Sequence, residues 1–368
     1  MADSNMQLNW TDEQWNKVRQ VVYEEARKAR VAGNVLPLYG PLEPDARFIS
    51  NESLSDAAFA PGLKGRSISV KDADTLRLST LQVEVFLRGA QVADPELTSA
   101  LTAFRRAANI VARVEDEIIF RGQPRSGQRP PVIRKLGDKP ISNPADEIGR
   151  VVGGQRTDGL LAPQDDGLPV PWRPASRTLA SEKQRESEES ERSEESEEWQ
   201  ESEGSHARHI VYVEHGDNEL RTIGEALVTT ISQAIMDLEE RHHLGPFACI
   251  LGHRYFNAVQ TPVEKSMVLP QDRILPFLGG GALLRTSTLP EDVGLVIALG
   301  GQPIDLVVGT DISVKFLQVT LDPYYVFRVY EKIVLRVKQP DAIAVLMPAQ
   351  FAEEAATETL DMPRSCSS

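Results

Sequence analysis

The chain has 368 residues, of which 41% are hydrophobic and 26% charged, and its formal net charge is -14 at pH 7. This length suits two domains, or one large domain with insertions, and allows a sizeable core. The acidic balance excludes a general nucleic-acid binder. The chain has no run of ~18 apolar residues, which excludes a membrane span. Its two cysteines are too few for a disulfide framework, and this low number favours a reducing compartment.

The N-terminal stretch is expected to form one capped helix. Thr11 and the glutamine three residues later have the spacing of a capping box, which marks a helix start. Trp15, Val18 and Val22 then recur on one face of that helix. Such a stripe usually packs on the protein's own core, and the alternative is that it lines a docking groove for a partner.

An extended loop is expected next. Arg66–Leu87 contains the alternating segments SISV and TLRLSTLQVEVFL, which are typical of a two-stranded ribbon. A ribbon with few local packing partners needs a neighbour to stabilise it. This pattern is the first indication that the chain assembles.

The clearest element is a long helix from Asp94 to Gly122. Asp94 is suited to cap it, Pro95 to occupy its first turn, and Gly122 to end it. At ~1.5 Å per residue this helix is about 40 Å long. A helix of that length exceeds what a small domain needs and suits a flat molecule built along one long helix. One apolar stripe comprises Leu97, Leu101, Phe104, Ala108, Val111 and Ile118.

Residues 123–209 are expected to form a disordered insertion. The first part is rich in Pro, Gly, Arg and Asp. Ser181–Ser205 then holds eleven glutamates against three basic residues, a net charge of -8 within one Glu/Ser-rich segment. A segment of this composition has too few apolar side chains to form a packed core.

The remaining third of the chain is expected to be ordered up to a tail. His209–Val213 reads as a strand, Asn218 as the cap of a helix, and Phe247–Leu251 as a buried strand. A strand array follows, with segments at Gly294–Leu299, Ile304–Val308, Ile312–Thr320, Tyr324–Val337 and Ala342–Leu346, separated by Gly and Asp-Pro turns. Residues 348–368 are polar and expected to be mobile.

No motif in the chain indicates catalysis or metal binding. Gly279–Gly281 lacks the spacing and the lysine of a phosphate loop. No serine lies in a nucleophile elbow, and the histidines lack ligand spacing. The residues alone therefore favour a structural or interaction protein, with no catalytic residue, metal or cofactor.

Four stretches resemble the encapsulin shell proteins of the linocin/bacteriocin-like family. They are LNWTDEQWNKVRQVVYEEARKARVAGNVLPLYGPL, RGAQVADPELTSALTAFRRAANIVARVEDEIIFRG, GPFACILGHRYFNAV and LVVGTDISVKFLQVTLDPYYVFRVYEKIVLRVKQPDAIAVL. The likeness covers residues 8–122 and 210–347, and the insertion is a departure from the family pattern.

The resemblance implies an α+β fold of the tailed-phage major capsid (Hong Kong 97) type. It implies these parts: 1–45 N-terminal helix and arm, 46–90 extended loop, 91–122 spine helix of the peripheral domain, 123–209 insertion, 210–300 mainly axial domain, 301–347 C-terminal strands of the peripheral domain, and 348–368 flexible tail.

The resemblance also implies a function. The chain would assemble with itself into an icosahedral, cytoplasmic nanocompartment, without nucleic acid or membrane, around a cargo enzyme or iron-storage protein that carries a short targeting peptide. Trp15, Val18 and Val22 would belong to the cargo-docking groove, and Val263, Glu264, Lys265 and Ser266 to a pore loop.

Two alternatives to that function stay open at this point. One is a phage major capsid protein on the same fold, and the other is a bacteriocin-like or proteolytic enzyme. The acidic insertion is expected on the outside of a shell, because so many like charges would repel one another in a confined lumen.

Overall fold

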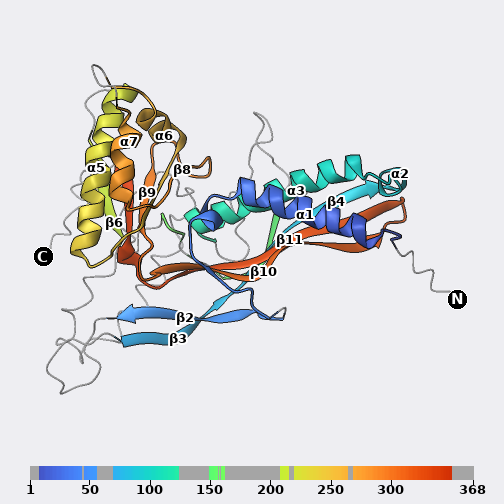
Figure 1. Cartoon of the computed structure of the whole chain (residues 1–368). Helices are drawn as coiled ribbons and strands as arrows, with labels where there is room; N and C mark the ends of the chain where they lie inside the picture. Colours follow the sequence, from blue (N-terminus) through green and yellow to red (C-terminus); the bar gives the residue numbers. More distant parts are fainter. Residues whose placement is uncertain are drawn as a thin grey trace, which may run out of the picture.

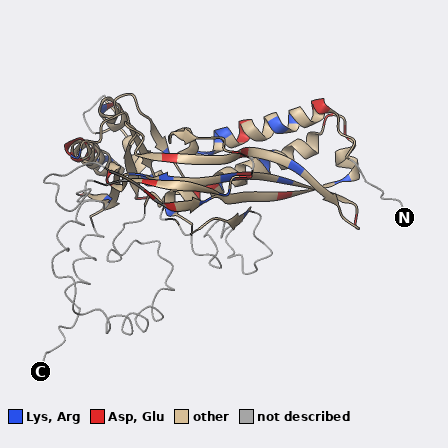
Figure 2. Cartoon of the chain, turned by 90° about the horizontal axis from the view of Figure 1, so that it is seen from below, with Lys and Arg blue, Asp and Glu red and all other residues tan. Residues whose placement is uncertain are grey.

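A computed structural model gives the structure of the chain (Figure 1). It describes residues 8–43, 45–55, 69–123, 149–155, 157, 159–161, 208–214, 219–263 and 268–349. Figure 1 shows an elongated body with a helix-covered unit at one end and a two-stranded ribbon below it. Figure 2 shows that basic and acidic residues both occur along the length of this body.

The helices are α1 (Asp12–Ala29), α2 (Gly89–Val92), α3 (Thr98–Arg121), α5 (Leu220–Glu240), α6 (His253–Val259) and α7 (Pro270–Ile274), with 3-10 turns η1 (Ala32–Asn34), η4 (Leu275–Leu278) and η5 (Pro340–Ala342). The strands are β1 (Leu38–Tyr39), β2 (Phe48–Ser55), β3 (Ser69–Arg77), β4 (Ser79–Arg88), β5 (Gly149–Gly153), β6 (His209–Val213), β7 (Phe247–Leu251), β8 (Leu283–Arg285), β9 (Gly294–Ala298), β10 (Ile304–Val319), β11 (Tyr324–Val337) and β12 (Ile343–Pro348).

The larger unit is a five-stranded sheet in the order β1-β10-β11-β4-β5, with α1 and α3 on one face (Figure 1). Three odd-numbered residues of β11, namely Phe327, Val329 and Ile333, are fully buried beneath these helices. The two strands predicted at 304–308 and 312–320 form the single strand β10, which keeps its pairing with β11 through local register shifts. One core therefore joins the helices to the sheet.

The long helix α3 ends where the sequence predicts and starts later. Its C-cap Gly122 has φ 81°, a left-handed conformation that glycine adopts without strain. At the other end, the carboxylate of Asp94 accepts from the backbone N–H groups of Glu96 and Thr98, and Leu97 has φ 55°. This turn precedes the helix, so Pro95 lies before its first residue. All six predicted stripe residues are buried.

Part of the predicted insertion belongs to the fold, which corrects the expectation of disorder for residues 149–155 and 159–161. β5 pairs antiparallel with β4. The N–H groups of Leu160 and Leu161 donate to the carbonyls of Ile119 and Phe120, and both leucines are buried. Gly159 makes this approach possible, since a Cβ there would collide with the backbone at Arg121. The Glu/Ser-rich segment lies outside the described residues.

The ribbon predicted within 66–87 has different strands from those expected. Its strands are β2 and β3, whereas β4 leaves the ribbon and pairs with β11 in the large sheet. A small cluster of Leu76, Leu78, Val307 and Val334, with Ile49 against it, joins the base of the ribbon to the sheet face opposite the helices.

The second unit is a five-stranded sheet in the order β6-β12-β9-β7-β8, packed against α5, α6 and α7. β12 pairs with β9 and β6, so the last strand lies in this sheet rather than with β10 and β11, contrary to the expectation for 301–347. α5 begins at Leu220, and the predicted cap Asn218 lies outside the described residues.

Candidate docking and assembly surfaces

The N-terminal helix packs on the core through the residues predicted for docking. Its capping box is present, because Thr11 accepts from the N–H of Gln14 and the Gln14 side chain accepts from the N–H of Thr11. Val18 and Val22 are fully buried in the main core. They therefore offer no surface to a docked peptide, and their docking role remains a prediction that the burial does not favour.

Trp15 is different, because it belongs to an aromatic cluster that reaches the surface. Trp10 stacks on Phe327 with 4.8 Å between ring centroids, and its Nε1 donates to the carbonyl of Val92 at 3.0 Å. Trp15 meets Trp10 edge-on at 5.1 Å and stays partly exposed. The Arg19 guanidinium lies 5.7 Å from the centroid of the Trp15 ring. The cluster anchors the start of α1 and leaves one aromatic side chain accessible.

The strand β10 has an open edge on the side of the large unit where Trp15 and Arg19 of α1 lie. β1 covers β10 only at Leu306 and Val307, so within the described residues the rest of that edge of β10 has no strand partner. Val314 and Phe316 of β10 pack half-exposed against the core. On α1, Tyr23 is 49% exposed. We call Trp15, Arg19, Tyr23, Val314 and Phe316 the α1–β10 strip; it combines apolar surface with unpaired backbone groups.

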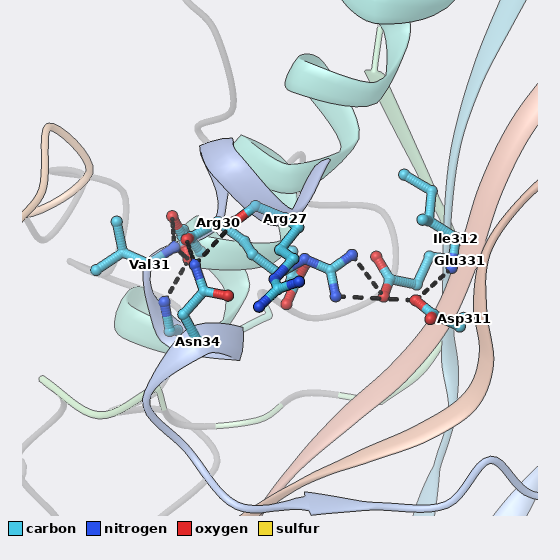
Figure 3. A network of polar contacts seen from close by, with 10 residues as sticks. Arg27, Arg30, Val31, Asn34, Asp311, Ile312 and Glu331 are labelled. Atoms are coloured by element: carbon cyan, nitrogen blue, oxygen red, sulfur yellow. Dashed lines mark hydrogen bonds and ion pairs between the residues drawn. The ribbon is translucent and has the colours of Figure 1, made fainter. Parts of the chain in front are cut away.

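A buried ionic cluster fixes the end of α1 to the sheet (Figure 3). The Arg30 guanidinium lies 3.3 Å from Glu115 of α3, 3.4 Å from Glu331 of β11 and 3.8 Å from Asp311 of β10. Glu115 and Glu331 are 0% exposed. The neighbouring Asp116 carboxylate accepts from the N–H groups that follow Arg30, at 2.8–3.0 Å. One cation therefore serves carboxylates from a helix and two strands.

Burial raises the pKa of each buried carboxyl in this cluster. Desolvation is the largest cause for Glu331, whose pKa rises from 4.5 to about 7, with Arg30 opposing the rise. For Asp116 the pKa rises to about 7 against the pull of its N–H donors. The pKa of Glu115 rises well above 4.5 through desolvation and then through the charge of Glu331. Arg30 faces both Glu115 and Glu331, so these two buried carboxyls titrate together as a pair with raised pKa values.

This cluster predicts a pH-dependent stability. The folded state holds these protons more tightly than the unfolded chain, so the contribution is largest below the ordinary pKa of 4.5 and falls as pH rises toward about 7. The shift of Glu331 accounts for roughly 3 kcal/mol over that window. Glu331→Gln should flatten the decline between pH 5 and 7 in urea unfolding. An equal decline in the variant and the wild type would contradict this assignment.

The ribbon β2–β3 leaves both of its edges and two large apolar side chains uncovered within the described residues. Phe48 and Val70 are each 58% exposed. The base is fixed by Arg336, which bonds the Asp305 carboxylate at 2.7 and 2.9 Å, reaches Glu52 at 3.7 Å, and lies over the ring of Tyr39 at 4.8 Å. A rigidly held base with an exposed remainder is suited to contact another molecule.

The predicted pore loop follows α6 in the second unit. Val263 is its first residue and is partly buried. Glu264, Lys265 and Ser266 lie outside the described residues, so their role remains a prediction.

The described residues contain no group of three or more His, Cys, Asp or Glu side chains that could hold a metal ion. His209 instead contacts Asp237 at 2.7 Å and Arg241 at 3.0 Å. None of the described helices has both the length and the apolar character needed to cross a bilayer.

The fold is that of capsid and shell proteins. A virus-like particle protein of Pyrococcus furiosus superposes with a TM-score of 0.52 and 16% identity, covering 91% of this chain and 99% of that one. The capsid protein of the Myoviridae phage XM1 gives a TM-score of 0.50 at 11% identity, covering 86% of this chain and 90% of that one. These similarities confirm the predicted α+β fold of Hong Kong 97 type.

Within that class, the chain belongs to the encapsulin family. The family described as "Encapsulating protein for peroxidase" matches residues 6–142 and 212–334. The type 1 encapsulin shell protein EncA of Myxococcus xanthus is 32% identical over 123 residues, which are 33% of this chain and 42% of that protein. The diheme-cytochrome-encapsulin shell fusion protein of Kuenenia stuttgartiensis is 31% identical over 113 residues, 31% of each chain. The matched stretches span less than half of these two relatives. The predicted family is confirmed.

Proposed function

We propose that the chain assembles with copies of itself into a closed shell that encloses a cargo protein in the cytoplasm. The observation that carries this proposal is the β2–β3 ribbon, which is firmly held at its base and exposes Phe48 at that base and Val70 near its far end. A two-stranded ribbon is marginal by itself in water, so a neighbouring subunit is its natural partner. Membership of the encapsulin family supports the shell.

The family match also separates this proposal from its alternatives. A phage capsid protein shares the fold, as the phage XM1 similarity illustrates, but the matching family describes encapsulating proteins. We infer a non-catalytic subunit without its own cofactor, because the matching family is one of encapsulating proteins. Purified particles should therefore carry cargo protein rather than DNA. Particles filled with double-stranded DNA would favour the capsid alternative.

The α1–β10 strip is our proposed cargo-docking surface. An extended peptide could pair with the open edge of β10 and place apolar side chains beside Trp15 and Phe316. This surface replaces Val18 and Val22, which the fold uses for packing. We also retain Val263–Ser266 as the proposed pore loop of the axial unit. The family description makes a peroxidase one candidate cargo, and an iron-storage protein is another.

The docking proposal predicts that Arg19→Glu with Tyr23→Ser lowers the amount of cargo per shell by about tenfold, since ~1.4 kcal/mol of lost contact changes binding by that factor. Both side chains are exposed, so assembly should persist. The measurement is the ratio of cargo to shell protein after co-expression with the neighbouring genes. Lys28→Glu, exposed on the same helix, is the matched control.

Two results would contradict the docking site. Unchanged loading in the double variant would exclude the α1–β10 strip. Loss of loading in the Lys28→Glu control as well would show a general charge effect on α1. Val18→Ala is a poor probe, because removing core methyl groups costs about 1–3 kcal/mol of stability and confuses loading with folding.

A further inference from the structure

The solvent side of α3 carries arginines and no exposed acid over most of its length. Thr102, Asn109 and Arg113 are spaced three or four residues from Arg105 or Arg106 or from each other, so all five lie on one side of the helix. All three arginines are exposed. We call Arg105, Arg106 and Arg113 the arginine face.

Arg105 and Arg106 have no counter-charge in the part of the chain that the structure describes, whereas Arg113 lies near the buried Asp116 carboxylate and opposes the rise in its pKa. Arg105 and Arg106 form no ion pair or hydrogen bond there, and Arg113 donates only to the neutral hydroxyl of Ser287 at 3.2 Å. Farther along α3, Glu115 and Asp116 are buried, and Glu117 is paired with Arg121 at 3.7 Å. Like charges at helical spacing repel one another, so this surface favours an anionic partner.

The flanking helix does not supply that partner. α1 carries four basic and four acidic residues, and so adds no net charge: Lys17, Arg19, Arg27 and Lys28 against Asp12, Glu13, Glu24 and Glu25. Lys17 is already bonded to Glu96 at 2.9 Å. Arg105 and Arg106, on a chain whose formal net charge is -14, therefore remain without a local acid among the described residues.

The chain contains an anionic segment that starts close to this stripe. Ser181–Ser205 carries a net charge of -8 and lies outside the two stretches that match the encapsulin family. The chain that leads to it departs from Leu161, whose N–H donates to the carbonyl of Phe120 at 2.9 Å, at the C-terminal end of α3. The attachment point of the acidic segment is thus fixed beside the helix that bears the arginine face.

The length of the connection allows contact. Arg113 precedes Arg121 by eight residues, about 12 Å along the helix axis. Leu161 and Ser181 are twenty residues apart, and a chain of that length reaches at most about 70 Å, well beyond this distance. A partner tethered within reach binds intramolecularly, which favours it over a free polyanion.

We propose that the Glu/Ser-rich segment Ser181–Ser205 binds along the arginine face of α3 of its own chain. The contact consists of glutamate carboxylates on Arg105, Arg106 and Arg113, and is therefore weakened by salt. It keeps a cationic surface from recruiting nucleic acid. It uses residues separate from the α1–β10 strip. It places the segment on the α1–α3 side of the subunit, which faces the cargo in the proposed shell, and so departs from the outside position expected from charge repulsion.

Zero-length carbodiimide coupling tests the contact, because the reagent joins a carboxylate only to an amine that touches it. Arg105→Lys with Arg106→Lys keeps the charge and supplies the amine. Mass spectrometry should find these positions joined to glutamates between 182 and 203, at least fivefold more often in ~20 mM than in ~0.5 M salt, as screening requires. The native amine of Lys28 is the internal control.

Coupling at positions 105 and 106 that is no more frequent than at Lys28, or that is insensitive to salt, would overturn the proposal. A second measurement uses a labelled single-stranded 20-mer DNA as probe. Deletion of Ser181–Ser205 should increase its binding at least tenfold, and Arg105→Gln with Arg106→Gln should remove that gain. Equal binding by the full chain and the deletion variant would mean that the arginine face is open to nucleic acid, and would also overturn the proposal.

Discussion

Replacing Arg30 by methionine is expected to lower the free energy of unfolding by about 3–5 kcal/mol, the range for a buried ion pair that loses one partner. The variant leaves Glu115 and Glu331, both 0% exposed, without the cation that they share. Protonation of these carboxyls offsets part of the loss at low pH, so the loss should be larger at pH 8 than at pH 5.

The measurement is urea unfolding followed by tryptophan fluorescence at fixed protein concentration. Arg27→Met is the matched control: Arg27 is exposed on the same helix, and only its backbone carbonyl accepts from Asn34. Its cost should stay within about 0.5 kcal/mol. Adding Glu331→Gln to the Arg30→Met variant should recover part of the loss. An Arg30→Met variant as stable as the wild type at pH 8 would refute the role of this cluster.

Shortening the ribbon is expected to abolish closed particles while leaving a folded subunit. Asn51 and Asp74 are opposite each other in β2 and β3, so an Asn-Gly turn can replace residues 52–73. The base, including Ile49 and Leu76, is retained. If subunits meet through the ribbon, a small oligomer or monomer should replace the particles in light scattering, with unchanged circular dichroism per retained residue.

Val152→Ser is the control for this experiment, because Val152 is exposed on β5, in the large sheet and outside the ribbon. It should assemble as the wild type does. Normal particles from the shortened chain would show that the ribbon makes no required contact between subunits.

Local signals in the sequence predicted the helices well. The capping box at Thr11 and the C-cap at Gly122 both occur in the structure. The stripe of α3 is buried as its periodicity indicates. The start of α3 was placed too early, because an aspartate that accepts from two N–H groups can build a turn before a helix as well as cap one.

Pairing over long sequence distances was beyond the sequence patterns. Alternation marks β4 as a strand, but nothing local says that its partner is β11, more than 230 residues away, rather than β3. β5 was missed because five residues, GRVVG, stand within a stretch rich in Pro, Gly and Arg. β12 was assigned to the wrong sheet because nothing local in its sequence identifies its partner strand. Its short apolar run fits the core of either unit.

The buried ionic cluster did leave a signal. Glu331 shares the face of β11 that carries Phe327, Val329 and Ile333, where an apolar residue is expected. Glu115 and Asp116 likewise interrupt the apolar run of α3. A charge at such a position indicates a buried partner. Arg30 could not be identified as that partner, because it follows the last residue of α1, where a basic residue is ordinary.

The central claim is that this chain closes into a shell. Its most direct test is size-exclusion chromatography of the full-length protein, followed by negative-stain electron microscopy of the void peak. The account predicts closed, uniform, icosahedral particles. A monodisperse monomer or dimer, at concentrations where the subunit is folded, would contradict it.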